Sequence, residues 1–420
     1  MATREEIELI RERIDMAEFL SRYVALKRSG KNYAAICPFH ADQRPSLVVD
    51  PERKLFHCFG CQAGGDLFKF LMKIERLSFG EALERLAGET GVSLSSRSSS
   101  KDKLWELNEQ AARYFQENLE SEAGAAARRS LAKRGIAPET MKKFRLGYAL
   151  PGWDNLLKKI GRTEELAQLG LVVQGREGRY YDRFRDRIVF PLCDSVGRVI
   201  GFAGRVFRGQ GDEPKYLNIS NTPLFTKGEA VYGLHLARQE NPMELILVEG
   251  YTDVIACHQA GLTNVIATMG TALTEQQARL LRRYVERVVL AYDRDAAGQA
   301  AALRGMRALR NAGLDVQVAL LPEDGDPDSL IRAQGATTFR ATLDAALPFH
   351  QFYISHLGEQ ARGDNPLLIE RLLHEAGAFI QGIASSPLRH ELIRGLSQEF
   401  GLTEEEVELE LRRGQGRAPP

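Results

Sequence analysis

The 420-residue sequence lacks the long apolar segments of membrane and exported proteins. No run of eighteen apolar residues occurs, and the first thirteen residues, MATREEIELIRER, are charged instead of signal-like. These absences exclude a membrane-spanning helix and an export signal, and they predict a cytoplasmic protein with no membrane partner. The sequence also contains no GxxxxGK[ST] loop, which excludes a fused P-loop motor domain.

The sequence has no net charge, since Lys+Arg and Asp+Glu number 56 each, so bulk charge indicates no polyanionic partner. The charges are nevertheless segregated along the chain. Residues 176–227 contain ten Lys or Arg against six Asp or Glu, and a group of acidic residues follows between 249 and 328. A basic stretch followed by an acidic cluster is typical of a protein that holds nucleic acid with one surface and metal with another.

Cysteine is scarce, with five residues in the chain, so a disulfide framework is not expected. Cys193 and Cys257 stand alone in apolar segments and are predicted to be small core residues. The other three fall within 25 residues and indicate a metal site.

The chain is long enough for two or three domains, and no internal repeat divides it. A Ser-rich charged stretch at 93–103, SLSSRSSSKDK, predicts a flexible tether between an N-terminal module and the rest. The predicted units are a zinc module at 1–95, a linker at 96–103, a mixed α/β segment at 104–240, an α/β sheet at 241–330 and a helical segment at 331–420.

Hydrophobic periodicity places the main elements. Helices are predicted at 104–119 and 125–134, and a strand–turn–strand unit at 187–206 with its turn near Asp194–Gly197. Residues 243–322 alternate as βαβαβαβ, which implies a largely parallel sheet with helices on both faces and ligands at the carboxyl ends of its strands. From 338 to 413 the pattern is helical only. The alternating strands are predicted at 243–250, 264–270, 287–293 and 316–322, with helices at 252–261, 274–285 and 296–313.

Two close pairs of ligand-type residues follow the pattern C-x2-H-x17-C-x2-C. The residues are Cys37, His40, Cys58 and Cys61. Two-residue gaps let both members of a pair reach one tetrahedral ion, so the pattern predicts a closed, structural zinc site. His57 is adjacent to Cys58 and is interpreted as a bystander. The cations and aromatic residues nearby suit contact with single-stranded nucleic acid, although a solvated zinc-ribbon surface explains them equally well.

Acidic residues follow three of the predicted parallel strands. Glu249 ends the first, Asp293 and Asp295 end the third, and Asp326 and Asp328 follow the fourth. These carboxylates should meet at one sheet edge, where they would repel unless a cation neutralised them. Carboxylates suit Mg²⁺ or Mn²⁺ and the chemistry of nucleotidyl transfer. The alternative, that individual acids are helix N-caps, stays open residue by residue.

Arg183, Arg185 and Arg187 alternate along a segment that is expected to be extended, so they are predicted to share one face and to follow a phosphate backbone. The alternative is a solvated strand edge in which Asp182 and Asp186 interleave with the cations.

Four motifs in a fixed order together resemble the bacterial DnaG-type primases, and the resemblance covers nearly the whole chain to about residue 400. The matching stretches are ICPFHADQRPSLVVDPERKLFHCFGCQAGGD, DRFRDRIVFPLCDSVGRVIGFAGRVF with PKYLN, VEGYTDVIA, and YDRDAAG. The resemblance implies a CHC2 zinc ribbon, a mixed α/β basic subdomain, a TOPRIM α/β sheet and a C-terminal helical subdomain. It implies a DNA-directed RNA polymerase that makes short RNA primers from NTPs on single-stranded DNA and releases pyrophosphate.

The resemblance also implies roles for matched positions. Cys37, His40, Cys58 and Cys61 are the expected ligands of one structural Zn²⁺. Glu249, Asp293 and Asp295 are the expected catalytic residues, and with Asp253, Asp326 and Asp328 they are expected to hold one to three Mg²⁺ or Mn²⁺ ions. The residues expected to bind template and nucleotide are Arg134, Arg183, Arg185, Arg205, Lys215, Tyr216, Asn218 and Lys227.

The sequence departs from the family pattern in two places. Arg294 replaces the glycine usual between the paired aspartates, which can alter the turn or reach a phosphate. The chain stops at GQGRAPP, so the helicase-docking domain usual in the family is expected to be absent, and coupling to the replicative helicase is in doubt. Single-stranded DNA-binding protein is a further candidate partner, and a monomer is expected.

Two other classes of protein share parts of this pattern. A DNA-cleaving TOPRIM enzyme, either a topoisomerase or a nuclease, would retain the same carboxylates, but a topoisomerase would need a nucleophilic tyrosine domain for which no long extra segment exists. A zinc-ribbon DNA-binding protein without catalysis would not account for the carboxylates that follow three of the predicted parallel strands.

Overall fold

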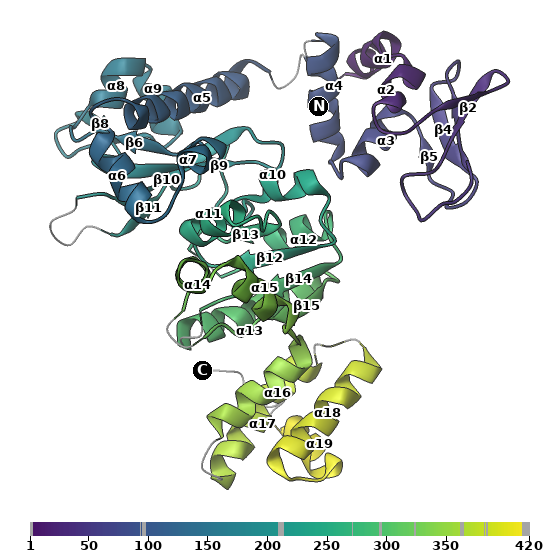
Figure 1. Ribbon diagram of the computed structural model, residues 1–420, viewed down its shortest axis with the longest axis vertical. Coiled ribbons are helices and arrows are strands. Elements are labelled where there is room, and N and C mark those ends of the chain that lie inside the picture. The colour runs from purple at the N-terminus through teal and green to yellow at the C-terminus, as the bar shows by residue number, and fades with distance from the viewer. Residues whose placement is uncertain are drawn as a thin grey trace.

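Three hydrophobic cores organise the chain. The structure is a computed structural model that describes residues 3–92, 94, 98–208, 214–270, 272–293, 296–322, 325–361, 365–381, 383 and 385–413. One core lies within the N-terminal module, and the other two lie on opposite faces of a parallel sheet at the centre of the molecule (Figure 1). Among the described residues given above, no helix is long and apolar enough to cross a membrane.

The N-terminal module is an antiparallel sheet of strand order β1-β2-β3-β4-β5 packed against helices. Phe39, Phe56 and Phe70 meet at ring-centroid distances of 5.2–5.9 Å and fill the space between sheet and helix. Its elements are α1 (Arg4–Arg13), α2 (Met16–Ser21), β1 (Lys27–Ser29), β2 (Asn32–Ala35), β3 (Leu47–Asp50), β4 (Leu55–Cys58), β5 (Gly64–Gly65), α3 (Leu67–Ile74) and α4 (Phe79–Thr90).

The next unit is an antiparallel sheet of order β11-β10-β9-β6, with α5 packed against it. The predicted strand–turn–strand unit is confirmed as β9 and β10. Helix α5 begins at Ser98, so residues 98–103 are helical and the predicted linker at 96–103 is too long; residues 95–97 lie outside the described residues. The amphipathic helix that buries Leu104 and Leu107 extends backwards into the Ser-rich stretch.

The elements of this second unit are α5 (Ser98–Glu120), α6 (Ala125–Lys133), α7 (Pro138–Lys143), β6 (Gly147–Ala149), α8 (Asn155–Ile160), α9 (Thr163–Gln168), β7 (Val172–Gln174), β8 (Tyr180–Asp182), β9 (Arg187–Cys193), β10 (Val199–Val206) and β11 (Tyr216–Asn218).

The central sheet has the order β13-β12-β14-β15-β16, and its first four strands are parallel, as predicted. Strand β12 is buried on both faces: Ile246 and Val248 belong to one core, Leu245 and Leu247 to the other. Helix α11 covers the first face, whereas α12 and α13 cover the second. The elements are α10 (Leu234–Ala237), a 3₁₀ turn (Arg238–Glu240), β12 (Glu244–Val248), α11 (Tyr251–Gln259), β13 (Val265–Ala267), α12 (Glu275–Arg282), β14 (Arg287–Leu290), α13 (Ala296–Asn311) and β15 (Asp315–Val318).

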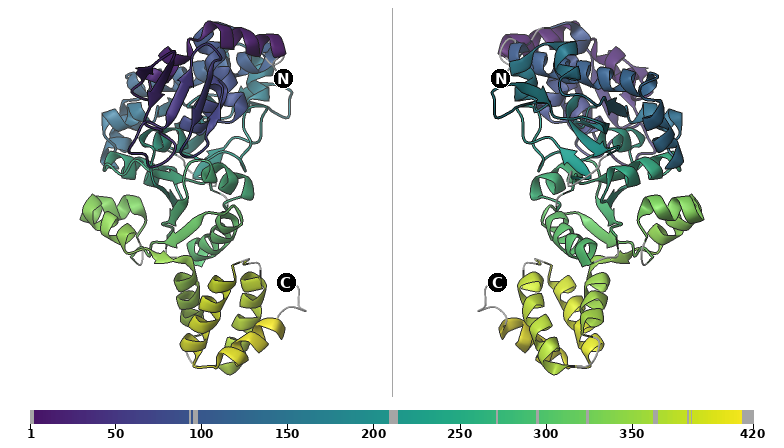
Figure 2. Two further views of the ribbon diagram at one scale, coloured as in Figure 1. Left: turned by 90° about the vertical axis from the view of Figure 1, so that its right-hand side faces the viewer. Right: turned by 90° about the vertical axis from the view of Figure 1, so that its left-hand side faces the viewer.

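The C-terminal part is helical apart from the two-residue strand β16, which the purely helical prediction for 338–413 missed. Helices α14 and α15 pack on the central sheet unit beside α11, so the predicted boundary at 330/331 falls inside α14. The last four helices form a bundle below it (Figure 2), which shares a hydrophobic core with α12, α13 and the second face of the sheet. The elements are α14 (Pro327–Gln334), α15 (Ala336–Asp344), β16 (Leu347–Pro348), α16 (Phe349–Gln360), α17 (Pro366–Gln381), α18 (Ser386–Phe400) and α19 (Glu404–Arg413).

Helix α4 of the N-terminal module contacts the rest of the chain through acidic side chains. Glu81 accepts hydrogen bonds from Ser195 Oγ at 2.5 Å and from Arg283 Nη2 at 2.7 Å, and Glu84 pairs with Arg198. Burial acts to raise the pKa of Glu81, but the hydrogen bonds from Ser195, Ser78 and Arg283 outweigh it and lower the pKa to about 2. The module is therefore docked by charged contacts that the sequence patterns did not predict.

Candidate functional site

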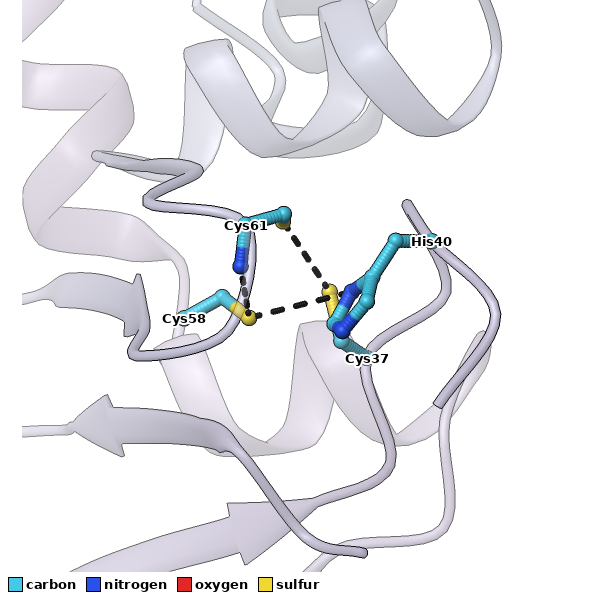
Figure 3. Close-up of side chains that lie close together, drawn as sticks. All are labelled: Cys37, His40, Cys58 and Cys61. Carbon is cyan, nitrogen blue, oxygen red and sulfur yellow. Dashed lines mark hydrogen bonds between the residues drawn. The ribbon is translucent and has the colours of Figure 1, made fainter. Parts of the chain in front are cut away.

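The four predicted zinc ligands lie together in the N-terminal module (Figure 3). Their ligand atoms all fall within 4.8 Å of one another. Cys58 ends strand β4, Cys61 follows in the next turn, and Cys37 and His40 come from the loop after β2. The imidazole Nδ1 of His40 faces the Cys58 sulfur at 3.9 Å. Three thiols and one imidazole in this arrangement are a closed donor set that fits structural zinc.

The surroundings of Cys58 stabilise a thiolate. The Ser46 hydroxyl lies 3.2 Å from the Cys58 sulfur, and the backbone N–H groups of Gly60 and Cys61 donate to it at 3.3 and 3.4 Å. Burial acts to raise the pKa of this thiol, but the hydrogen bonds lower it to about 6. Metal-binding cysteines must be deprotonated, so these donors prepare the ligand. His57 is outside the cluster, and its ring packs edge-on against Phe59.

The predicted acidic residues lie around the carboxyl edge of the central sheet. Glu249 comes directly after β12, and its Oε1 accepts a hydrogen bond from the backbone N–H of Asp293 at 3.3 Å. Gly298 makes this approach possible, because a Cβ at this position would lie 2.1 Å from the Asp293 carbonyl oxygen and 2.9 Å from Glu249 Oε1. Strands β12 and β14 thus place one carboxylate each at the same edge. Asp295 and Arg294 lie outside the described residues.

Asp253 occupies the first turn of α11 and is 6% exposed. Burial raises the pKa of its carboxyl group to about 7, and the negative charges of Asp326, Asp293 and Asp328 add to the shift. Burial and neighbouring negative charges destabilise the ionised form of this carboxylate, and a cation bound nearby would stabilise it.

Asp326 and Asp328 have structural partners of their own. Asp326 is the N-cap of α14 and accepts a hydrogen bond from the Ser329 N–H at 2.6 Å, so the helix-cap alternative holds for this residue. Asp328 lies within the first turn of α14 and pairs with Arg332 at 3.0 Å. Neither contact consumes both oxygens of its carboxylate.

Among the residues that the structure describes, no three acidic side chains of this edge have carboxylate oxygens within 4.8 Å of one another. They interact electrostatically instead, since Asp253 is affected by the charges of Asp293, Asp326 and Asp328. An all-carboxylate donor set with this looser spacing fits a hard cation that retains several waters, such as Mg²⁺.

Basic residues reach the same edge from the neighbouring unit. The pKa of Arg205 is lowered by burial and by the charge of Arg134, while the charge of Asp328 opposes this. Arg134 likewise acts to lower the pKa of Asp328, although burial raises it overall. Arg134 and Arg205 therefore lie within electrostatic range of Asp328, so positive charge is available at the edge where a metal-bound polyphosphate would need it.

The three alternating arginines do not share one face, which corrects the sequence prediction. The chain bends between β8 and β9, and each side chain enters a different environment. Arg183 donates to the Asn218 carbonyl at 3.1 Å, Arg185 stacks on Trp153, and Arg187 is 4% exposed beneath β10 and Pro214. Asp186 has a positive φ of 48°, so the segment is not a regular strand.

Asn218 and Tyr216 join the antiparallel sheet to the central sheet. Asn218 accepts a hydrogen bond from the Tyr251 hydroxyl at 2.8 Å and donates to the Met269 carbonyl at 3.1 Å. Tyr216 and Tyr251 have ring centroids 5.8 Å apart. Sequence reasoning missed Tyr251, whose place between Glu249 and Asp253 was the available signal. Lys215 is exposed and Lys227 is half-buried.

Family models match three consecutive parts of the chain. The CHC2 zinc finger matches residues 2–102, the N-terminal domain of the DNA primase catalytic core matches 114–238, and a Toprim-like model matches 246–331. These matches agree with the positions of the zinc cluster and of the parallel sheet.

Known proteins resemble the chain over almost its whole length. A DNA primase of Clostridium acetobutylicum is 38% identical over 415 residues, which cover 96% of this chain and 68% of the relative. The crystal structure of the zinc-binding and RNA polymerase domains of Aquifex aeolicus primase matches 96% of this chain and 99% of its own with a TM-score of 0.64 and 32% identity. A DnaG primase catalytic domain bound to ssDNA matches 71% of this chain and 99% of its own, with a TM-score of 0.64 and 36% identity. With its zinc ribbon, catalytic core and TOPRIM sheet in the same order, the chain belongs to the bacterial DnaG-type DNA primase family.

Proposed function

We propose that the carboxyl edge of the central sheet is the catalytic centre at which this primase joins ribonucleotides on a single-stranded DNA template. The observation that carries the proposal is that Arg134 and Arg205 lie within electrostatic range of Asp328, whose charge acts on Asp253 together with that of Asp293. A cationic side and an acidic side at one edge suit a nucleoside triphosphate bound together with divalent metal.

In the proposed reaction, the 3′-hydroxyl oxygen of one nucleotide forms a bond with the α-phosphorus of the next, and pyrophosphate leaves. Glu249, Asp253, Asp293, Asp295, Asp326 and Asp328 would hold Mg²⁺ or Mn²⁺, which when bound neutralises charge on the triphosphate. Glu249 lies against the Asp293 backbone, so it fixes the position of Asp293 and can accept the hydroxyl proton. Arg134 and Arg205 would bind phosphate oxygens from the opposite side.

The template is proposed to lie along β10 and β11, past Lys215, Tyr216 and Asn218. Tyr216 and Asn218 contact Tyr251, which lies between Glu249 and Asp253 in the chain. Their contacts with phosphate and sugar carry no sequence information, which suits an enzyme that copies many templates. Lys227 is proposed as a phosphate contact.

Primer synthesis from labelled NTPs on single-stranded DNA tests the proposal. We expect Asp293→Ala combined with Asp295→Ala to reduce the rate by at least about 100-fold, since carboxylates that hold the metal act on the transition state. Asp315→Ala is the matched control, because Asp315 is an exposed aspartate at the amino end of the same sheet and pairs with Arg287. Undiminished synthesis by the double variant would refute the assignment, and relaxation or nicking of plasmid DNA without synthesis would indicate a DNA-cleaving enzyme.

A further inference from the structure

The C-terminal bundle contains a second group of metal-ligating side chains, which is remote in sequence from the zinc cluster. It consists of Glu370 and His374 on α17 and Glu410 on α19. The ligand atoms of the three side chains all lie within 4.8 Å of one another. Among the residues that the structure describes, only this group and the zinc cluster bring at least three such side chains together. None of the zinc, catalytic or template-binding roles described above involves these residues.

Glu370 and His374 reach a common point because they are four residues apart on one helix. This spacing places both side chains on the same face, one turn apart. Helical zinc motifs use the same spacing to direct two ligands at one ion. His374 Nε2 lies 4.0 Å from Glu370 Oε1 and 2.8 Å from Glu410 Oε2. The imidazole nitrogen thus faces one carboxylate of its own helix and one of the neighbouring helix.

Close packing of α17 against α19 places the third ligand. Gly377 lies at the contact between the two helices, where a Cβ would collide with the Leu411 carbonyl oxygen. Val407 and Leu411 are buried, so apolar contacts hold α19 in the bundle without help from the charged residues. The side chains of His374 and Glu410 retain only 20% and 19% of their accessible surface. The fold of the bundle therefore fixes this part of the group.

Arg413 orients the Glu410 carboxylate from outside the group. Its Nη1 donates to Glu410 Oε1 at 2.7 Å, whereas Glu410 Oε2 faces His374. A hydrogen-bond partner that orients a ligating carboxylate in this way is typical of metal sites. Two carboxylates and one guanidinium also leave a net negative charge around the imidazole, and this charge favours a bound cation.

We infer that Glu370, His374 and Glu410 form a binding site for a first-row divalent transition metal ion, of the class of Zn²⁺ and Co²⁺. An imidazole ligand suits these ions, whereas Mg²⁺ and Ca²⁺ take oxygen ligands. Three protein ligands leave at least one coordination position for water, unlike the closed zinc cluster. The bound ion would join α19 to α17. The inference is independent of the proposed catalytic centre, since the two sites share no residue.

Calorimetric titration of the zinc-loaded full-length protein with Co²⁺ tests the inference, in excess Mg²⁺ to occupy the carboxylate edge. We expect one Co²⁺ per chain whose binding is abolished by His374→Gln. The bound ion should lack the sulfur-to-cobalt charge-transfer absorption that exchange into the cysteine cluster would produce. His390→Gln is the matched control, because His390 is an exposed histidine on α18 outside the group, and it should bind Co²⁺ normally. Equal Co²⁺ binding by wild type and His374→Gln would overturn the inference and leave an ordinary contact between His374 and Glu410.

Glu370→Gln adds a second test in a variant that should stay folded, because the Glu370 side chain is half-exposed. It should weaken Co²⁺ binding at least about tenfold, since the loss of a partner outside the ligand set alone can have that effect. Co²⁺ should raise the midpoint of thermal unfolding of the wild type more than that of this variant, because the ion binds the folded bundle. Glu375→Gln, an exposed position on the same helix that pairs with Arg371, should behave like the wild type. Unchanged affinity of Glu370→Gln, or an equal loss in Glu375→Gln, would overturn the assignment.

Discussion

The zinc cluster and the carboxylate edge are both groups of metal-ligand side chains, but their geometry differs. In the zinc cluster, four ligand atoms lie within 4.8 Å of one another. At the carboxylate edge, the described acids influence one another by charge while each keeps a separate partner: Asp326 caps α14, Asp328 pairs with Arg332, and Asp253 accepts from the Gly250 N–H. The first site is assembled by the fold, whereas the second remains open.

The difference follows from what each ion has to do. A structural ion is enclosed by protein ligands and contributes directly to folding. A catalytic Mg²⁺ keeps several waters and shares its coordination with the substrate phosphates, so its protein ligands need not touch one another. The comparison therefore predicts that loss of a zinc ligand affects stability most, and that loss of an edge carboxylate affects activity most.

The largest effect is expected from His40→Ala. Removal of one ligand from a closed site should abolish stoichiometric zinc binding, and the apparent binding free energy in zinc-dependent modules is about 10 kcal/mol or more. Metal analysis should show less than about a tenth of the wild-type zinc, and calorimetry should show the N-terminal module unfolded while the remaining cores still melt cooperatively.

His57→Ala is the matched control, because His57 lies next to Cys58 in sequence but its ring packs on Phe59. It should retain one zinc per chain. Equal loss of zinc from both variants would contradict the ligand assignment.

An intermediate effect is expected from Asp253→Asn in buffer free of Mg²⁺ and Mn²⁺. The folded-state pKa of Asp253, about 7, exceeds the value of about 3.9 in an unfolded chain, so the folded protein binds a proton that the unfolded chain releases. This group therefore favours folding below about pH 4 and loses its contribution as pH rises to about 7. At pH 8 the variant should be more stable than the wild type, by at most about 4 kcal/mol.

Urea unfolding at pH 5 and pH 8 measures this difference. The asparagine oxygen can still accept from the Gly250 N–H, so the comparison isolates the charge. Added Mg²⁺ should stabilise the wild type more than the variant, since the charged carboxylate binds the ion. A difference between the two proteins that does not change with pH would contradict this account.

The smallest effect on stability is expected at Asp326, where cap and metal roles can be separated. Asp326→Ser keeps an oxygen that can cap α14 and should change the free energy of unfolding by only a few tenths of a kcal/mol, whereas Asp326→Ala should cost about 1 kcal/mol. If Asp326 also supports the metal, both variants should lose primer synthesis, since neither retains the carboxylate. Full activity of Asp326→Ser would restrict the residue to its cap.

Several features were predictable because they follow from local spacing. The pattern C-x2-H-x17-C-x2-C gave the zinc cluster, and the alternation of buried strands and helices gave the parallel sheet with Glu249 and Asp293 at its carboxyl edge. The predictions for the arginine segment and for the linker were wrong, because tertiary contacts that the local pattern does not contain decide the conformation there. Arg183, Arg185 and Arg187 diverge because β8 ends at Asp182, and the irregular segment before β9 includes the positive φ of Asp186. The Ser-rich stretch is helical from Ser98 because α5 continues into it.

The sequence by itself determined which four residues form the candidate zinc site, the order of the units and the family, because these depend on residue types at short, fixed separations. Only the tertiary structure decided which distant side chains interact: Arg205 and Arg134 with Asp328 through their charges, Glu81 with Ser195 and Arg283, and Arg185 with Trp153. These pairs join different sheets and helices, and their contacts depend on how the three cores pack. No periodicity in the sequence specifies that packing.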